Sequence, residues 1–587
     1  MEDRRQGSGT DYSLHPDTCG LNVDRPALST TWQNRDHRRR FEELPASTGS
    51  NGPPMIRVQK DVLHETKGYQ VECDEDPIEL RFTCSRAARL PPTTILPCAT
   101  STRPSGVRFE YDRDLCVPVS ADVSQLVERL GPSRVLTGPS IPPRYQTDAF
   151  RAHRGSLLEE HGPSPAAVVL PQSVDEVVTV VRFMVDAGLK MVPWGGGTGL
   201  MGGARPTFDS IVLDLRNMRR VRSIDAVSGT ATVEAGIVLE VLDRRLRKRG
   251  LTLGHDPWSR PRATVGGAIG TNGIGYAGYL RGTMGDQVLG LEAVLGDGSV
   301  IRTRPAARST TGLDLKRLFI GSEGTLGIVT GATLRVFPVP EAEEIQAFRL
   351  KDFATGFAAL GRLYDDGLTP SLMDFEETFE APALPWSGEA GPPTLYLGFA
   401  GAEEIVAASW RIARRCLKAA HARALPDREA RDYWRTRHDI IYMHDEISPG
   451  VTRADVALKE TIFDYVHVAL PRSRILAFRR AALPILHHHN VHPIGFGLWT
   501  QPELVSVEVV KPVVGERAAA KAAVAGALDS LIRKAHALGG SMEYVHGIGV
   551  KLAHLMGEEL GTGVDLARRI KNALDPSGIL NPGKLGL

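Results

Sequence analysis

The sequence LKMVPWGGGTGLMGGARPTFDS, residues 189–210, decides the fold. Its apolar start predicts a short buried strand over residues 190–194, which runs into a glycine-rich segment at residues 195–203. Glycine adopts positive φ without strain and lets a ligand approach the main chain closely. Successive amides in such a segment form a concave anion site, so we expect this loop to hold a pyrophosphate.

The same segment matches the pattern G-x-G-x-x-G at Gly197, Gly199 and Gly202. That pattern marks a nicotinamide-binding Rossmann unit only where a helix begins at the glycines. Here Pro206 and an apolar strand predicted over residues 210–215 follow instead. We therefore reject a Rossmann unit and expect a strand–glycine loop–strand unit of a different dinucleotide-binding fold.

The overall composition is that of a multidomain globular protein without a dominant charge. The chain has 587 residues, 42% of them hydrophobic, and a formal net charge of +1, so we expect no binding of nucleic acid. Six cysteines without a C-x-x-C pair predict neither a disulfide framework nor a zinc site. The charged, polar start predicts no signal peptide, and no apolar run is long enough for an integral membrane protein, which favours a cytoplasmic location.

Residues 1–118 are an N-terminal extension to which the sequence assigns no role. Residues 1–54 are polar and rich in glycine, serine and proline, which predicts disorder over much of this stretch. Residues 55–117 contain short strand-like pieces interrupted by prolines. Four cysteines occur there at irregular spacings and are expected to be unpaired structural thiols, namely Cys73, Cys84, Cys98 and Cys116.

Residues 119–340 show a regular alternation of strands, helices and glycine-rich segments. Ser173 and Gly188 are the expected start and stop signals of one helix in this region. A second glycine-rich loop is predicted over residues 254–278 and a third glycine-rich turn within residues 318–340. Separated loops of this kind suit one extended cofactor lying between two lobes, so we expect a single cofactor-binding domain.

The rest of the chain is predicted to form two further parts. Residues 341–540 alternate strands with helices, and we expect this α+β region to cover the substrate. Residues 541–587 contain a glycine-flanked turn that carries His546, followed by a last helix. We expect this C-terminal segment to complete the cofactor site.

Together these segments resemble the FAD-linked oxidoreductases of the vanillyl-alcohol-oxidase-like superfamily, whose FAD-binding domain is of the PCMH type. The resemblance is to the branch with D-lactate and D-2-hydroxyacid dehydrogenases, the glycolate oxidase FAD subunit and alkyldihydroxyacetonephosphate synthase. The matching sequences are PWGGGTG (193–199), ATVGGAIGTNG (263–273), GSEGTLGIVT (321–330), HGIG (546–549) and LNPGKL (580–585). The resemblance implies an α+β fold: a two-lobed PCMH-type FAD-binding domain, then an α+β cap with an antiparallel sheet and helices, then a C-terminal segment returning to the FAD domain.

The resemblance also implies FAD as the cofactor and indicates which residues surround it. They are Pro193, Trp194, Gly195, Gly196, Gly197, Thr198, Gly199, Trp258, Ser259, Thr264, Gly266, Gly267, Thr271, Asn272, Gly273, Ile274, Glu323, Gly324, Thr325, Gly327, Ile328, Val329 and Asn581. Related enzymes with a covalent flavin have a histidine in the first glycine loop, where this chain has Thr198. The second loop has no cysteine, so we expect non-covalent FAD.

Oxidation of an alcohol by a flavin requires a base for the hydroxyl proton and a group that holds the rest of the substrate. His546 is the predicted base, because imidazole titrates near neutral pH; alternatively, it hydrogen-bonds to the flavin or packs beneath it. The resemblance places a carboxylate-binding arginine at Arg437, beside His438, and a second basic residue at Arg453. Since guanidinium groups bind carboxylates through paired hydrogen bonds, we expect a small anionic substrate, unless these are ordinary surface arginines.

Dehydrogenases of this branch bind a divalent metal through two histidines of a G-H-x-G-D-G-N-x-H segment and a glutamate. In this chain Phe496 and Thr500 replace the aspartate and the second histidine, and Val545 replaces the glutamate. We therefore expect no metal and a reaction that relies on His546 or another base. The three consecutive histidines at residues 487–489 are expected to be a solvated helix end, because adjacent side chains point in different directions.

The favoured hypothesis is a FAD-dependent oxidoreductase that oxidises a small, hydroxylated, anionic molecule similar to a 2-hydroxy acid by hydride transfer to flavin N5. One alternative is an enzyme like alkyldihydroxyacetonephosphate synthase that forms a covalent flavin adduct, although residues 504–510 lack the tyrosine and His444 stands near the expected arginine. Another alternative is a flavin subunit of a multi-subunit dehydrogenase complex. The electron acceptor stays unknown, and a homodimer is left open.

Overall fold

The computed structural model describes residues 122–149, 162–207, 210–380, 390–439 and 460–587, and the backbone of residues 29–31 and 70–72. The chain divides into two compact units, Met1–Pro118 and Val119–Leu587. In the first unit β1 (Ser29–Thr31) pairs antiparallel with β2 (Gln70–Glu72). The other predictions made for this unit, including its four cysteines, lie outside the described residues.

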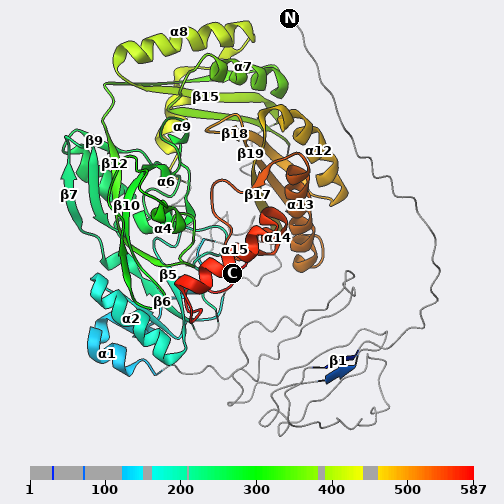
Figure 1. Ribbon diagram of the computed structural model, residues 1–587. Coiled ribbons are helices and arrows are strands. Elements are labelled where there is room, and N and C mark those ends of the chain that lie inside the picture. Colours follow the sequence, from blue (N-terminus) through cyan, green and yellow to red (C-terminus); the bar gives the residue numbers. More distant parts are fainter. Residues whose placement is uncertain are drawn as a thin grey trace, which may run out of the picture. The chain divides into compact units, whose positions relative to one another are not determined.

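The second unit contains three sheets and the helices that cover them (Figure 1). Its described helices are α1 (Ser124–Leu130), α2 (Val174–Ala187), α3 (Leu239–Arg247), α4 (Val265–Thr271), α5 (Gly278–Arg281), α6 (Met284–Gln287), α7 (Phe353–Asp365), α8 (Glu403–Ala419), α9 (Asp427–Thr436), α12 (Ile475–His488), α13 (Arg517–Ala537), α14 (Met556–Leu560) and α15 (Gly563–Leu574). None of the helices in the described ranges has the length and apolar character needed to cross a bilayer.

Two sheets with separate hydrophobic cores form the first half of this unit. The smaller has the order β3 (Val135–Thr137), β4 (Ala167–Val169), β6 (Ser210–Asp214) and β5 (Lys190–Trp194), and its last three strands are parallel. The larger is antiparallel, with the order β11 (Val300–Arg302), β10 (Val288–Val294), β12 (Ile328–Pro338), β8 (Thr230–Glu234) and β7 (Val221–Asp225), while β9 (Leu251–Leu253) pairs with the end of β12. The two predicted lobes are therefore present.

The helix predicted between Ser173 and Gly188 is confirmed as α2. The Ser173 hydroxyl accepts a hydrogen bond from the Glu176 amide at 3.2 Å, and Gly188 ends the helix with φ of 65°. The first glycine-rich segment also behaves as predicted, since it joins β5 to β6 without an intervening helix. This outcome supports the rejection of a Rossmann unit.

The second glycine-rich segment is not the continuous loop that the sequence suggested, because it contains α4. Thr264 caps this helix by accepting a hydrogen bond from the Gly267 amide at 3.3 Å. Val265, Ala268 and Ile269 are buried at helical spacing, so burial of this apolar side stabilises a helix that its glycines disfavour. The prediction of a loop was wrong over these residues.

The third sheet is antiparallel and forms the core of the second half. Its strand order is β16 (Arg423–Ala424), β13 (Ala342–Arg349), β15 (Gly391–Gly401), β14 (Leu372–Thr378), β18 (His492–Trp499), β19 (Leu504–Pro512), β17 (Thr461–Ala469) and β20 (Ser541–Met542). Helices α7 and α8 lie along β15, and α12 and α13 lie beside β17–β19 (Figure 1). These four helices cover only one face of the central strands.

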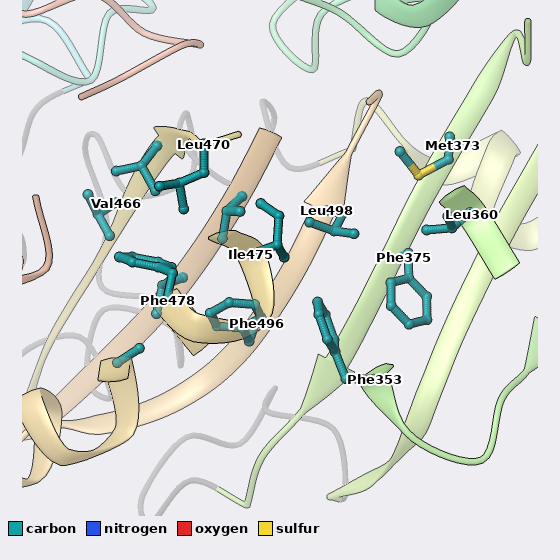
Figure 2. Close-up of a cluster of buried hydrophobic side chains, with 14 of the residues drawn as sticks. Phe353, Leu360, Met373, Phe375, Val466, Leu470, Ile475, Phe478, Phe496 and Leu498 are labelled. Atoms are coloured by element: carbon teal, nitrogen blue, oxygen red, sulfur yellow. The ribbon is translucent and has the colours of Figure 1, made fainter. Parts of the chain in front are cut away.

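The face under the helices is apolar. Phe375 of β14 and Phe496 of β18 pack against Phe353 of α7, with ring centroids 5.1 Å apart in both pairs (Figure 2). Each buried side chain of this size stabilises the fold by about 1.5–3 kcal/mol. Because successive strand residues point to opposite faces, the residues next to these phenylalanines point away from the core.

The C-terminal segment returns to the first half of the unit, as the family resemblance implies. Leu580 forms a parallel bridge with Met191 of β5, and the Met191 amide donates to the Ile579 carbonyl at 2.8 Å. Earlier in this segment, β20 pairs with the end of β17. The turn that carries His546 therefore runs between the large sheet and β5.

Candidate active site

The first two glycine-rich segments lie side by side. A Cβ atom on Gly195 would be 2.4 Å from Thr264 Oγ1, and one on Gly196 would be 2.3 Å from the Arg262 carbonyl oxygen. Side chains cannot fit at such distances, so the two segments approach as closely as only glycine permits. The structure thus brings together two of the three segments that the sequence assigned to FAD.

The amides of the first loop form a donor set that fits an anion. Within the described part of the chain, the N–H groups of residues 196–199 donate to no protein acceptor. At the start of α4, in contrast, Val265 donates to the Ile237 carbonyl at 3.0 Å and Gly266 to the Ala235 carbonyl at 2.7 Å. The first loop therefore fits the FAD pyrophosphate, whereas the amides that begin α4 are already used.

The third glycine-rich turn packs against both of the others. Its Glu323 amide donates to the Gly270 carbonyl of α4 at 2.8 Å. A Cβ atom on Gly324 would lie 2.4 Å from Pro193 Cγ at the end of β5. Glu323 and Gly324 both have positive φ, 50° and 73°, which makes this turn sharp enough to fit between them.

The turn that carries His546 contacts all three glycine-rich segments. Glu323 accepts hydrogen bonds from the amides of Ile548 and Gly549, at 2.6 Å and 2.9 Å. The Val550 amide donates to the Met201 carbonyl of the first loop at 3.0 Å. A Cβ atom on Gly273 would lie 3.5 Å from the Val545 carbonyl oxygen, so the second segment ends beside this turn as well.

Other residues predicted to bind the cofactor support these segments from within the protein. The Asn581 side-chain amide donates to the carbonyls of Gly203 and Glu323 at 2.9 Å and 2.6 Å, which joins the first loop to the third turn. Thr325 and Ile328 are buried at 0% and 1% exposure, like core residues. Val329 and Gly327 also pack against protein atoms. Their assignment to FAD stays a prediction.

The remaining predicted cofactor residues frame the second segment. The Asn272 side chain accepts a hydrogen bond from the Gly285 amide at 3.0 Å, and the Thr271 hydroxyl donates to the Gly267 carbonyl at 3.2 Å. The Ser259 carbonyl accepts from the Ala263 amide at 2.8 Å. Trp258 and Ile274 belong to a largely aromatic cluster, which also includes Tyr276, Tyr396, Tyr433, Trp434, Trp499 and Tyr544.

His546 lies among polar groups that the sequence did not single out. Its ring centroid is 5.1 Å from that of Tyr465 and 5.0 Å from that of His467, both on β17. Glu543 Oε1 lies 3.6 Å from His546 Nδ1. Glu543 stands three residues before His546 in the sequence and could have been found by inspecting the residues around that histidine. In contrast, only the fold brings β17 to this position.

A polar row crosses the sheet from this histidine. His467, Ser506, Gly497 and Glu376 are in register on four neighbouring strands and therefore point to the same face, opposite the apolar core. The spacing of strands places Glu376 about 14 Å from His467. Glu508, opposite Tyr465, is also on this face.

Glu376 and Glu508 of this face approach each other across β18, where Gly495 has no side chain to separate them. A Cβ atom on Gly495 would lie 2.3 Å from Glu376 Oε1 and 3.5 Å from Glu508 Cβ. Burial, followed by the charges of Glu508 and Asp374, raises the pKa of Glu376 well above its usual value. This end of the row therefore disfavours further negative charge.

Arg437 and His438 lie at the edge of the aromatic cluster and contact the same carboxylate. Arg437 Nε is 3.1 Å from Asp256 Oδ2 and His438 Nε2 is 3.0 Å from Asp256 Oδ1, while Arg437 also stacks on Trp434. Burial alone would raise the pKa of Asp256, but His438, Arg260 and Arg437 outweigh it and lower the pKa below the usual range. The predicted substrate-binding role of Arg437 and His438 stays untested, and Arg453 lies outside the described residues.

The metal position of related dehydrogenases does not fit a metal in this chain. Phe496 is 1% exposed and points into the apolar core, and Thr500 is completely buried. Among the residues that the structure describes, no three histidine, cysteine, aspartate or glutamate side chains form a group that could hold an ion. The histidines at 487–489 end α12, with His487 and His488 exposed, which confirms the helix end expected there.

A hollow of about 370 Å³ lies on the surface of the larger FAD-domain sheet, between β7 and the end of α3. It is lined by Val221, Arg222, Ser223, Ile224, Arg245, Lys248 and Arg249, none of which belongs to the glycine-rich segments. Cations at the C-terminal end of a helix complement its dipole, and charges along an edge strand such as β7 oppose strand association. These two effects explain the positive charge without a ligand.

Substitution of Gly196 by alanine tests the proximity of the first two loops. The added methyl group would meet the Arg262 carbonyl, and such overpacking costs about 1–3 kcal/mol, so we expect FAD affinity to fall about 5- to 150-fold. Flavin absorbance per protein and a fluorescence titration with FAD measure this loss. Gly361→Ala in α7, where a Cβ atom meets nothing within 4 Å, is the control; unchanged flavin content in Gly196→Ala would contradict the geometry.

Glu323 is expected to make stability depend on pH. Burial, which outweighs the hydrogen bonds from Gly549 and Ile548, raises its pKa from 4.5 to about 7. The folded state therefore holds the proton more tightly than the unfolded chain, and this contribution is complete below pH 4.5 and is lost as the pH rises through about 7. We expect it to reach about 3 kcal/mol.

Glu323→Gln should remove this contribution, because the amide oxygen still accepts both hydrogen bonds but does not ionise. The unfolding midpoint of the variant minus that of the unmodified protein should therefore increase from pH 4.5 to 8, because only the unmodified protein loses stability over this range. Glu344→Gln, at a side chain that is 52% exposed, is the control and should show a constant difference. A constant difference for Glu323→Gln would show that the buried carboxylate does not titrate in this range.

Comparisons with known proteins agree with this geometry. A family model for an FAD binding domain matches residues 165–304, and a model for the C-terminal domain of FAD linked oxidases matches residues 339–585. A D-2-hydroxyglutarate dehydrogenase of Xanthomonas citri is 31% identical over 72% of this chain and 89% of its own length. An uncharacterized FAD-linked oxidoreductase of Escherichia coli is 37% identical over 43% of this chain, and the match spans only about half, 53%, of that relative.

Solved structures show the same fold at lower identity. An alkyldihydroxyacetonephosphate synthase is 21% identical with a TM-score of 0.58, over 72% of this chain and 77% of that one. A p-cresol methylhydroxylase with substrate bound is 20% identical with a TM-score of 0.61, over 79% of this chain and 96% of that one. The chain belongs to the FAD-linked oxidoreductases of the PCMH-type superfamily, and its cofactor is FAD.

Proposed function

We propose that the protein oxidises a small 2-hydroxy acid at its hydroxyl-bearing carbon, with His546 as the base that removes the hydroxyl proton. The supporting observation is the contact of the His546 turn with all three glycine-rich segments. Bound FAD supplies the two-electron acceptor for the hydride. The names of relatives, among them D-2-hydroxyglutarate dehydrogenases, favour a 2-hydroxy acid.

In this proposal the protein orients the substrate between the FAD loops and the polar row of the sheet. His546 takes the proton, and His467 and Tyr465 border the position of the hydroxyl group. The Ser506 hydroxyl lies 2.6 Å from His467 Nδ1 and holds the His467 ring in place. The aromatic cluster excludes water on the side of Trp258 and Trp499, whose ring centroids are 5.9 Å apart.

Arg437 remains the proposed partner of the substrate carboxylate, with a restriction. Its Nε and Nη1 atoms already donate to Asp256 and to the Trp434 carbonyl. One hydrogen of Nη1 and both hydrogens of Nη2 are left for a substrate, so the expected paired contact uses the Nη1–Nη2 side of the guanidinium rather than its Nε side. Arg453 is proposed as a second cation on the basis of the sequence alone.

Neither alternative function gains support from the site. The synthase-like hypothesis shares a fold with a solved synthase, and at 21% identity that likeness concerns the fold alone. Strand β19, with the sequence LVSVEVVKP, contains no tyrosine, which that hypothesis requires in this strand. A role as a flavin subunit of a complex would require a partner for turnover, which repeated turnover of the purified chain with substrate and a small-molecule electron acceptor would exclude.

The first test is anaerobic reduction of the flavin by D-2-hydroxy acids, read from the loss of its visible absorbance. We expect the unmodified protein to bleach and His546→Ala to bleach about 10²–10⁴-fold more slowly with flavin content retained, the usual contribution of a positioned base. His487→Ala at the exposed end of α12 is a control on the same residue type. Equal rates for His546→Ala and the unmodified protein would exclude His546 as the base.

The second test concerns the side chain of the substrate. The charge of Glu508, which contributes to the raised pKa of Glu376, should repel a second carboxylate, so we expect D-lactate to reduce the flavin with a higher kcat/KM than D-2-hydroxyglutarate. Glu508→Gln should narrow this ratio about tenfold, because relief of about 1.4 kcal/mol of repulsion corresponds to that factor. Glu377→Gln, on the opposite face and paired with Arg479 at 2.9 Å, should leave the ratio unchanged; a preference for the dicarboxylate would contradict this orientation.

A further inference from the structure

The carboxylate of Glu543 lies beside the proposed base, and an unusual turn of the main chain positions it there. Its Oε1 atom accepts hydrogen bonds from the Val545 and His546 amides, at 2.7 Å and 2.9 Å. The residue has φ of 50°, a conformation that non-glycine residues rarely adopt. The two hydrogen bonds offset this strain, and together they fix the carboxylate over the main chain of the residue that it faces.

The same carboxylate faces the His546 ring. Oε1 lies 3.6 Å from Nδ1, and the side chain of Glu543 is only 1% exposed. Neither Glu543 Oε2 nor His546 Nδ1 has a hydrogen-bond partner elsewhere in the described residues. The carboxylate beside Nδ1 therefore has one unpaired oxygen, and Nδ1 itself has no partner, so a rotation of either side chain would satisfy both buried groups.

We propose that Glu543 is a positioning residue that holds His546 with its Nδ1 protonated and leaves Nε2 free to take the substrate proton. A carboxylate beside Nδ1 favours the N–H on that nitrogen and stabilises the imidazolium that forms when Nε2 accepts a proton. Glu543 itself stays ionised. The proton moves from the substrate hydroxyl to Nε2, and no further reactant is needed.

None of the other described groups around His546 places a carboxylate next to a nitrogen of its ring. His467 and Tyr465 of β17 face its ring, and Tyr544 joins the Ser506 hydroxyl at 3.3 Å. Glu323 contacts the following residues, Gly547 to Gly549, through their main chain. Among the described groups facing the ring, Glu543 is the carboxylate within 4 Å of a ring nitrogen.

The electrostatics agree with an ionised Glu543. Burial alone would raise its pKa, but the interaction with His546, the charges of His546 and His467, and the main-chain hydrogen bond outweigh burial and bring the pKa to about 2. A carboxylate with so low a pKa is negatively charged throughout the range in which an imidazole titrates. It therefore stabilises the protonated ring at every pH at which the enzyme would work.

This inference rests on the proposed role of His546, but its test does not require turnover. Selective ¹⁵N labelling of histidine in the FAD-loaded protein, with His546→Gln to assign the signal, reports which ring nitrogen carries the proton and at which pH the ring protonates. We expect Nδ1–H in the neutral ring. In Glu543→Gln, which keeps both main-chain hydrogen bonds, protonation should move about 1–3 pH units lower.

Glu559→Gln is the matched control. Glu559 also accepts a main-chain hydrogen bond, from the Met542 amide at 3.0 Å, and lies 2.6 Å from a histidine, His536. It should leave the His546 signal unchanged. Glu543→Asp, which keeps the charge, should restore part of the shift.

Flavin reduction completes the test. Glu543→Gln should slow reduction about 10- to 1000-fold at pH values above the protonation of both forms, where both rings are neutral and the variant has the weaker base, with the substrate KM little changed. An Nε2–H tautomer in the unmodified protein, or a titration that Glu543→Gln does not move, would overturn the inference. If instead the titration shifts as expected while His546→Ala reduces its flavin normally, the positioning by Glu543 stands and the proposed function fails.

Discussion

The buried carboxylate of Glu323 is the contact on which the arrangement of the site depends. It belongs to the third glycine-rich turn and accepts the amides of Ile548 and Gly549, more than two hundred residues later in the chain. A buried carboxylate is costly unless hydrogen bonds satisfy it, so this turn requires the C-terminal segment to return. The Asn581 side chain adds a second tie between the same parts of the chain. Consequently, the proposed base reaches the FAD loops only when both ends of the second unit have folded together.

The large sheet supplies the opposite wall through the alternation of its strands. Phe375 and Phe496 point to the helices, whereas Glu376 and the bare Gly497 point to the other face, and each pair consists of neighbours in sequence. A slip of one residue in the pairing of β14 and β18 would exchange these faces and bury the glutamate in the core. The large apolar surface under α7, α8, α12 and α13 prevents such a slip. The stability of the core and the position of the polar row are therefore set by the same register.

The sequence predicted the features that depend on local patterns and missed those that depend on distant contacts. The strand over residues 190–194, the loop after it and the capped helix α2 follow from glycine positions and apolar spacing, and all are present. Helix α4 was taken for a loop because its glycines disfavour a helix in isolation, and its burial against β12 is a tertiary effect. Similarly, the approach of Asp256 to Arg437, 181 residues apart, and of His467 to His546 cannot be derived from spacing. Arg437 was assigned to the substrate from the family resemblance, and the sequence does not show that the same side chain also contacts Asp256.

The replacement of the metal-site aspartate by Phe496 and the position of Glu543 beside His546 affect the same step of the proposed reaction. Phe496 occupies the position of a metal-site aspartate and contributes to the apolar core, so this chain has no carboxylate there to help bind a cation. A cation near the substrate would make its hydroxyl easier to deprotonate, and the proposed reaction, which uses no such cation, requires a stronger base. Glu543 introduces a negative charge on the far side of the His546 ring, which raises the proton affinity of the base instead of lowering that of the substrate. Both changes alter the same free-energy difference, namely that between a proton on the substrate and a proton on the base. A carboxylate beside the base can therefore take the place of a cation beside the substrate only if Glu543 stays ionised and buried. The main-chain hydrogen bonds of its turn favour this state.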